Sequence, residues 1–149
     1  MTNLLNEMLK DDFFDKHPPK STGTDYFNLK WINKKISEFG EVSSEDIQAT
    51  LTELSAQVIF KELKDLRAEK KPIYLCGGGI HNLFLVKRIE ELIENQIYTT
   101  SEIGIDADFL EACCFAWLAK ERLDNTKFDL SKITGSKEKI LLGEIWEVT

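Results

Sequence analysis

The sequence lacks an excess of positive charge, a long apolar run and a paired set of cysteines. Its 149 residues carry 19 basic and 26 acidic side chains, for a net charge of −7, which argues against a protein that holds the nucleic-acid backbone on a basic face. No run approaches the roughly 20 apolar residues of a membrane-spanning helix, and no signal peptide precedes the first polar stretch. We therefore expect no nucleic-acid partner, no membrane partner and a cytoplasmic location.

Cysteine and histidine are both scarce. An odd number of cysteines, Cys76, Cys113 and Cys114, without C-x-x-C spacing predicts neither a disulfide framework nor a zinc site. Adjacent residues on a helix point about 100° apart, so we interpret the cysteines as small core residues in a reducing compartment. His17 and His81 are too few and too scattered to predict a metal site.

What the chain does contain is an alternation of helical and strand patterns. Apolar spacing predicts helices over residues 3–14, 21–36, 43–70, 81–96 and 106–123, and short strands over 73–76, 97–100 and 139–148. Thr22 is the expected cap of the second helix, and Ser43 or Ser44 that of the third. The last helix is apolar on most of its circumference, which is typical of a buried helix. This order of elements indicates the α/β class and one domain.

Three glycines, Gly77, Gly78 and Gly79, follow the strand expected at 73–76, and Asn82 begins the next helix. Without a Cβ, such a turn lets a ligand or another backbone come close, and the free N–H groups of the helix start favour anions. The string is neither G-x-G-x-x-G, which disfavours a dinucleotide-binding enzyme, nor a Walker A loop. Spacing alone leaves two interpretations open, a nucleotide site beyond the strand end and a tight strand-to-helix turn.

A second candidate site is the loop of Lys20, Ser21, Thr22 and Gly23, which follows two prolines. Its cation and two hydroxyls suit a phosphate or another polar ligand. The glycines of a Walker A loop are missing before Lys20. The alternative is a capped helix start preceded by prolines.

A third candidate is the acidic stretch 104–112, which contains Asp106, Asp108 and Glu111. Neighbouring carboxylates can do acid–base chemistry, bind a metal or receive sugar hydroxyls. The aspartates also suit the capping of a helix start. Glu111 leads into an apolar stretch, where a buried charge is costly without a partner. A functional role is therefore more strongly indicated for Glu111 than for the aspartates.

Four stretches, "PPKSTGTDYFN", "DIQATLTELSAQ", "LCGGGIHN" and "EIGIDADFLEACCFAWLA", resemble in their order and spacing the anhydro-N-acetylmuramic acid kinases, over nearly the whole chain. The resemblance implies part of the two-lobed, ribonuclease H-like fold shared by actin, hexokinase and Hsp70. It implies ATP and Mg²⁺ as cofactors. It also implies an activity that opens the ring of 1,6-anhydro-N-acetylmuramic acid and phosphorylates it to N-acetylmuramic acid 6-phosphate, in peptidoglycan recycling.

The resemblance also implies roles for the residues that match these motifs. Gly77, Gly78 and Gly79 match a turn that lies against the adenosine of ATP, with Asn82 at the following helix start. Glu111 matches the acid that receives the sugar. The loop from Lys20 to Gly23 is expected to face the cleft, and its role there is unassigned.

The sequence departs from the family in what it lacks. A glycine-rich phosphate loop followed by Asp-Gly, and an Asp-Thr-Gly-Pro-Gly segment that supplies the general base, are both missing. The resemblance therefore implies that residues 1–149 are a segment of the C-terminal lobe, without a catalytic or metal-binding residue and inactive alone. Two readings stay open: a kinase part that needs a separate first-lobe chain, and a non-catalytic remnant that binds nucleotide or a partner.

A lobe segment of this kind should be incompletely covered. The strand at 73–76 would keep an open edge, which invites pairing with other chains. The apolar helices at 48–60 and 111–119 would expose part of their surface. We therefore expect a chain that is marginally stable alone and that either associates with itself or needs a first-lobe partner.

Overall fold

The structure, a computed structural model, describes residues 2–68, 70–93 and 95–146. Its helices are α1 (Thr2–Leu9), α2 (Leu29–Ile36), α3 (Ser44–Asp65), α4 (Leu83–Ile93), α5 (Leu110–Leu123) and α6 (Ser131–Thr134). Its strands are β1 (Ile73–Leu75), β2 (Ile97–Thr99), β3 (Lys127–Phe128) and β4 (Ile140–Leu141), and three 3₁₀ turns are η1 (Asp12–Asp15), η2 (Gly78–His81) and η3 (Thr100–Ile103). This mixed order agrees with the predicted α/β class. Within the described ranges, every helix is too short or too polar to cross a membrane.

Helix α3 is 22 residues long and begins where the sequence predicted. Ser43 lies before it with extended backbone, and its Oγ accepts a hydrogen bond from the Asp46 N–H at 3.1 Å. Glu45 and Asp46 occupy the first turn, where negative charge stabilises the positive end of the helix dipole. The prediction of a serine cap at this position is confirmed.

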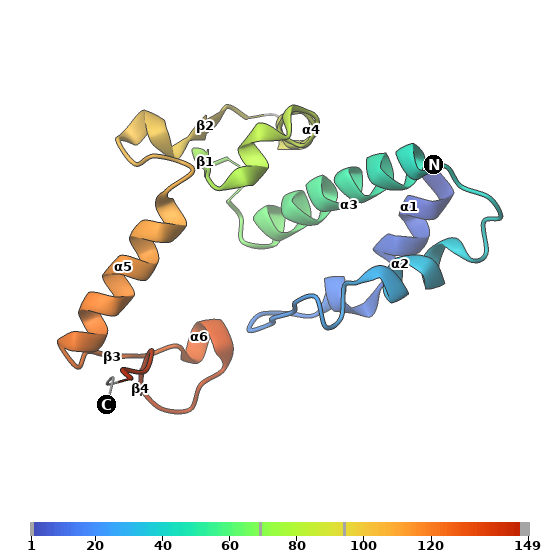
Figure 1. The fold of residues 1–149 in the computed structure, drawn as a ribbon. Coiled ribbons are helices and arrows are strands. Elements are labelled where there is room, and N and C mark those ends of the chain that lie inside the picture. Colours follow the sequence, from blue (N-terminus) through green and yellow to red (C-terminus); the bar gives the residue numbers. More distant parts are fainter. Residues whose placement is uncertain (1, 69, 94, 147–149) are drawn as a thin grey trace.

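Two apolar clusters lie against α3. The first brings together α1, η1 and α3, and its buried residues are Leu4, Leu5, Met8, Phe14 and Leu54. The second joins α3 to α4, and its buried residues are Ala56, Ile89 and Ile93. Full burial of one large apolar side chain stabilises the folded state by about 1.5–3 kcal/mol. These clusters therefore fix α1 and α4 on α3, as Figure 1 shows.

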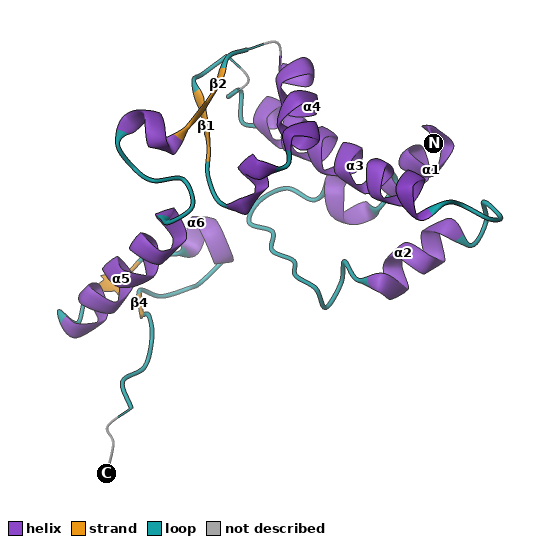
Figure 2. Ribbon diagram, turned by 45° about the horizontal axis from the view of Figure 1, so that its top comes forward, coloured by secondary structure: helices purple, strands orange, loops and turns teal. Residues whose placement is uncertain are grey.

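Strands β1 and β2 pair in parallel, with Ile73 opposite Ile97 and Leu75 opposite Thr99. Helix α4 connects them, so the three elements form a β–α–β unit (Figure 2). Arg88 of α4 donates to both carboxylate oxygens of Glu53 on α3, at 2.6 and 3.1 Å. The β–α–β unit, which carries the glycine stretch, is thereby held on α3 by packing and by a two-pronged ion pair.

Helix α2 begins later than predicted. Residues 21–23 have no regular structure, residues 24–28 form turns and bends, and α2 runs only from residue 29 to residue 36. Asn28, with extended backbone, accepts hydrogen bonds on its side chain from the N–H groups of Lys30 and Trp31, at 2.9 and 3.1 Å. The prediction of Thr22 as the cap is therefore wrong, because Asn28 satisfies the first free N–H groups of the helix.

The other element boundaries also moved. The first helix ends at Leu9 and is followed by η1, and α5 begins at Leu110 rather than at residue 106. The closing strand is reduced to β4, which pairs antiparallel with β3, a strand that the sequence did not predict. Parts of three predicted elements, at residues 69, 94 and 147–148, lie outside the described residues.

The prediction of a buried last helix is wrong. No residue of α5 is buried, and the side chains of Phe115 and Trp117 are 64% and 50% exposed. Cys76, Cys113 and Cys114 are exposed free thiols, so they are not core residues either. Figure 1 shows that α5 leads away from the α1–α4 part. Its apolar circumference is covered only in part, by contacts such as that of the Phe128 ring of β3, which lies 5.3 Å from the Trp117 ring. The exposed apolar surface expected of an incompletely covered lobe is confirmed for α5.

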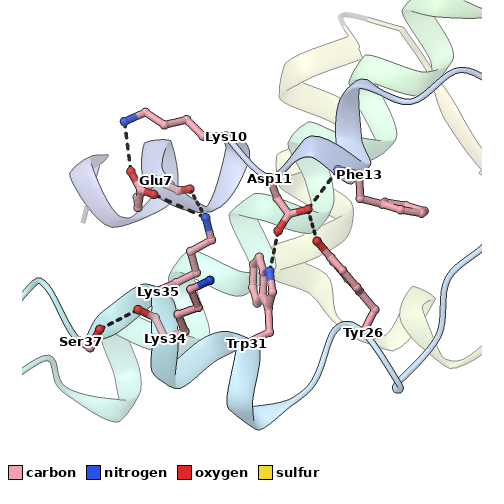
Figure 3. Close-up of polar contacts among 9 residues, drawn as sticks. All are labelled: Glu7, Lys10, Asp11, Phe13, Tyr26, Trp31, Lys34, Lys35 and Ser37. Carbon is pink, nitrogen blue, oxygen red and sulfur yellow. Dashed lines mark hydrogen bonds and ion pairs between the residues drawn. The ribbon is translucent and has the colours of Figure 1, made fainter.

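A buried carboxylate, Asp11, holds η1, the following loop and α2 together (Figure 3). Its Oδ1 accepts from the Phe13 N–H at 3.1 Å and the Tyr26 hydroxyl at 2.9 Å, and its Oδ2 accepts from Trp31 Nε1 at 2.7 Å. The residue is 8% exposed. Burial alone would raise the pKa of Asp11, but the hydrogen bonds from Trp31, Phe13 and Tyr26 outweigh it and hold that pKa below its ordinary value.

Replacing Asp11 by Asn should destabilise the fold, because the Asn amide cannot accept from Trp31 while its oxygen serves Phe13 and Tyr26. We expect a loss of about 1.5–3 kcal/mol in the free energy of unfolding at pH 7, measured by urea denaturation. The depressed pKa makes this stabilisation complete above about pH 3.9 and lost as the pH falls through the lower folded-state value. The exposed neighbour Asp12→Asn is the control, and equal stability of the two variants would contradict the role of Asp11.

The exposed face of α5 should make the chain associate with itself. We expect size-exclusion chromatography to give a species larger than a monomer that binds a dye for apolar surface. Phe115→Ser should reduce both the size and the dye binding, while Leu66→Ser, an exposed leucine at the end of α3, should reduce neither. A monodisperse monomer that binds no dye and unfolds cooperatively at high temperature would contradict this expectation.

Candidate functional site

The glycine stretch forms a turn that only glycine can make comfortably. Gly77 has φ 77° and ψ 175°, a backbone region essentially limited to glycine. Its N–H donates a hydrogen bond of 2.7 Å to the carbonyl of Ala107. A Cβ built on Gly78 would meet no atom within 4 Å. The turn is therefore fixed on one side by the Ala107 carbonyl and open at Gly78, where a flat group could approach the backbone.

Asn82 links this turn to α4. The 3₁₀ turn η2 ends at His81, and the Asn82 side-chain oxygen accepts from the Leu85 N–H at 3.1 Å. That hydrogen bond satisfies one of the free N–H groups at the start of α4. The helix start predicted near Asn82 is confirmed, and its side chain serves first as a cap.

The structure brings the glycine turn and the acidic stretch together. Besides the bond from Gly77 to Ala107, His81 Nε2 lies 2.7 Å from Asp108 Oδ1. Asp106 Oδ1 accepts from the Asp108 N–H at 2.9 Å, so Asp106 shapes the turn before α5. The interpretation of the aspartates as caps of this helix is wrong, because α5 is preceded by Phe109 without a side-chain cap, and the partner of Asp108 is the distant His81.

Glu111 lies in the first turn of α5, three residues beyond Asp108, and is exposed. Within residues 2–68, 70–93 and 95–146, no hydrogen bond or ion pair joins its carboxylate to another side chain. The argument from the cost of burying the Glu111 charge is therefore wrong, because this side chain is exposed to solvent. Its carboxylate is free to accept hydrogen bonds from a ligand that reaches the start of α5.

A hollow of about 460 Å³ opens beside Asn82, between α2, α3 and α4. Its lining combines apolar side chains with hydroxyls and amides: Leu29, Ile32, Asn33, Ile36, Ser44, Ile47, Gln48, Leu51, Thr52, Ser55, Asn82 and Leu85. This size and mixture are typical of small-molecule pockets. Sequence reasoning missed this hollow. The signal was present, because Ser44, Gln48 and Thr52 recur every four residues and form a polar stripe along α3.

The loop of Lys20, Ser21, Thr22 and Gly23 belongs to another part of the surface. Lys20 forms an ion pair with Glu62 of α3, and its Nζ lies 5.5 Å from the centre of the Phe13 ring. The cation therefore has a structural partner.

The same loop borders a hollow of about 570 Å³, lined by Phe13, Lys16, His17, Pro19, Lys20, Ser21, Thr22, Asp25 and Tyr26. A Cβ added to Gly135, at the end of α6, would lie 3.7 Å from Pro19, so the loop lies near α6, as Figures 1 and 2 agree. No hydrogen bond or ion pair among the described residues connects this loop to the glycine turn or to Glu111.

Metal ligation is the remaining chemistry that the acidic stretch could support. In the part of the chain that the structure describes, no three His, Cys, Asp or Glu side chains are placed to share a metal ion.

Comparison of the sequence with known proteins places this chain in a family. The family model described as anhydro-N-acetylmuramic acid kinase matches residues 1–148. A curated protein of Pasteurella multocida named anhydro-N-acetylmuramic acid kinase is 42% identical over 147 residues, which is 97% of this chain and 39% of that protein. Proteins of the same name from Actinobacillus pleuropneumoniae and Sulfurimonas denitrificans are 43% and 41% identical over 145 and 152 residues.

The match is nearly complete for this chain and partial for its relatives. It includes 96% and 97% of the chain, and 39% and 41% of the Actinobacillus and Sulfurimonas proteins. The chain thus spans about two-fifths of the length of the curated relatives it matches. By both the family model and these identities, the chain belongs to the anhydro-N-acetylmuramic acid kinase family.

Proposed function

We propose that this chain is the C-terminal-lobe part of an ATP-dependent kinase that opens the ring of 1,6-anhydro-N-acetylmuramic acid and phosphorylates it to N-acetylmuramic acid 6-phosphate. The observation that carries the proposal is the contact between two motifs. The Gly77 N–H is bonded to the Ala107 carbonyl at 2.7 Å, four residues before Glu111. A turn suited to a nucleotide and an acid suited to a sugar are therefore built into one local structure.

On the nucleotide side, four residues are proposed to border the adenosine of ATP: Gly77, Gly78, Gly79 and Asn82. The open space at Gly78 supports this role, because a flat base or ribose can lie against a backbone without a Cβ. The hollow beside Asn82 offers apolar surface together with hydroxyl and amide groups, which suits a purine and its hydrogen-bonding edge. Asn82 borders this hollow, whereas the three glycines lie outside its lining.

On the sugar side, Glu111 is proposed to accept hydrogen bonds from sugar hydroxyls. An ionised carboxylate accepts only, and hydrogen bonds to a charged acceptor are among the stronger ones in proteins. The exposed position of Glu111 in the first turn of α5 leaves its oxygens available. Its task would be to orient the sugar, since the proposal assigns no proton transfer to this residue.

The chemistry of transfer is proposed to depend on groups outside these residues. Bound ATP supplies the phosphoryl group, and Mg²⁺ neutralises charge on its phosphates. The described residues offer no cluster for the metal, and the chain contains no Asp-Thr-Gly-Pro-Gly segment to supply a base. We therefore propose that a first-lobe polypeptide completes the cytoplasmic enzyme, and that the chain alone is inactive. The loop from Lys20 to Gly23 is proposed to face the cleft.

A second candidate function is a non-catalytic module that binds nucleotide or a partner. The uncovered apolar face of α5 favours it, because an exposed patch of this kind marks a surface that another protein or a second copy can cover. The two functions differ in one outcome: only the kinase part should support sugar phosphorylation when a first lobe is supplied.

Replacing Gly78 by Val tests the nucleotide side. The new side chain finds open space in the free protein, so the fold should persist, but it occupies the region proposed for adenosine. We expect ATP affinity of the chain, measured by calorimetry, to fall by roughly tenfold or more, with a smaller loss for Gly78→Ala. A folded Gly78→Val variant with unchanged ATP affinity would return the stretch to a plain strand-to-helix turn.

Replacing Glu111 by Gln tests the sugar side. The amide keeps the shape but removes the charge from hydrogen bonds that are typically worth about 1.5–3 kcal/mol. In an enzyme reassembled with a first lobe, the sugar KM should rise, or kcat fall, by roughly tenfold, and ATP binding should be spared. Glu121→Gln, later on the same helix, is the matched control. Normal sugar kinetics in Glu111→Gln would show that this residue has no part in sugar binding.

A further inference from the structure

Two parallel contacts join the glycine turn to the start of α5. One is the main-chain bond from the Gly77 N–H to the Ala107 carbonyl, and the other is the side-chain pair of His81 Nε2 and Asp108 Oδ1, each 2.7 Å long. They connect the first and last residues of the turn to two adjacent residues of the acidic stretch. A carboxylate has no proton to give, so His81 Nε2 is the donor of the second bond.

Each end of this connection is held in place by its own surroundings. On the acidic side, Ala107 is 2% exposed, and its N–H donates to Ser101 Oγ at 3.1 Å. On the glycine side, the Gly77 carbonyl accepts from the Ile80 N–H at 3.1 Å, which closes the 3₁₀ turn before His81. Because neither end is a free loop, a movement at one end reaches the other through the two bonds.

A His–Asp pair can also orient an imidazole for catalysis, but the contacts at hand do not favour that role. Within the described residues, no hydroxyl, thiol or other nucleophile is hydrogen-bonded to the second ring nitrogen of His81. The pair also consists of only two side chains, which are too few to hold a metal. The pair instead forms a tie between the glycine turn and the start of α5, two segments that carry different parts of the proposed site.

We propose that His81 and Asp108 are positioning residues that hold the glycine turn in register with the start of α5. They thereby couple the glycine turn, where the nucleotide is proposed to bind, to Glu111, where the sugar is proposed to bind. The coupling of ligands rests on the proposed function, whereas the tie between the segments does not. Coupling between two sites is reciprocal, so loss of the tie should loosen both segments. The side chains are 64% and 51% exposed, which limits the effect of one pair to roughly two- to fivefold.

The test is amide hydrogen exchange on the full chain without ligand, followed residue by residue by NMR. His81→Ala and Asp108→Ala should each speed exchange of the Gly77 amide and of the Cys113 amide, which bonds to the Phe109 carbonyl in the first turn of α5, by roughly two- to fivefold. The double variant should add little to either single one. His81→Gln, whose amide can donate to Asp108, should restore slow exchange.

The matched control is Lys120→Ala, which removes the pair of Lys120 and Asp124, a pair exposed to a similar degree on the same helix. It should leave the Gly77 amide unchanged. Unchanged exchange at Gly77 in both single variants, or additive effects in the double variant, would overturn the tie. In Asp108→Ala, the factor by which the anhydro sugar alters the ATP dissociation constant should also shrink. Absence of ATP binding to every form would count against the proposed function, and the exchange data would still decide the tie.

Discussion

Helix α3 is packed on two sides, and the positions of the glycine stretch and of the hollow beside Asn82 depend on that packing. Its middle turns hold α1 and η1 through one apolar cluster, and its middle and last turns hold α4 through the other. The ion pair of Glu53 with Arg88 adds a polar connection, and the hydrogen bonds from Arg88 are the main reason that the pKa of Glu53 is lowered. Because α4 starts directly after the glycine stretch, its place on α3 also sets the direction in which that stretch faces.

The same packing explains why the hollow beside Asn82 exists. Ala56, at 0% exposure, is a small residue where α3 and α4 meet, and it lets the helices approach closely at that level. Nearer their first turns, Ser44, Gln48 and Thr52 face Asn82 across an open space. The helices are therefore close where Ala56 meets the isoleucines of α4, and apart where Ser44, Gln48 and Thr52 face Asn82. The hollow forms at the second place, next to the start of α4.

The sequence predicted those features that depend on neighbours in the chain. The Ser43 cap, the presence of a first helix and the helix start at Asn82 are all local patterns, and all are confirmed. It failed at the start of α2, where Asn28 and not Thr22 is the cap, and it failed where a distant element decides the outcome. The composition of α5 indicates burial, but burial also needs a covering element, and periodicity carries no information about whether one is present.

The candidate site divides in the same way. The glycines and the acids were identifiable by residue type, and the family resemblance assigned them roles. Their contact, through Gly77 with Ala107 and His81 with Asp108, could not be read from spacing, because it depends on how the chain after β2 returns to the end of β1. Conversely, the sequence indicated that Lys20 was a cation available to a ligand, whereas in the structure Lys20 forms an ion pair with Glu62.

The most direct test of the proposal that a first-lobe polypeptide completes the kinase is a phosphoryl-transfer assay with ATP, Mg²⁺ and 1,6-anhydro-N-acetylmuramic acid. The chain is assayed alone and together with a separately expressed polypeptide that contains the remaining length of the Pasteurella multocida relative. We predict no sugar-dependent ATP turnover by the chain alone, and formation of N-acetylmuramic acid 6-phosphate once the two polypeptides associate. Sugar-dependent ATP turnover by the chain alone, or no product from a verified complex of the two polypeptides, would contradict the proposed function.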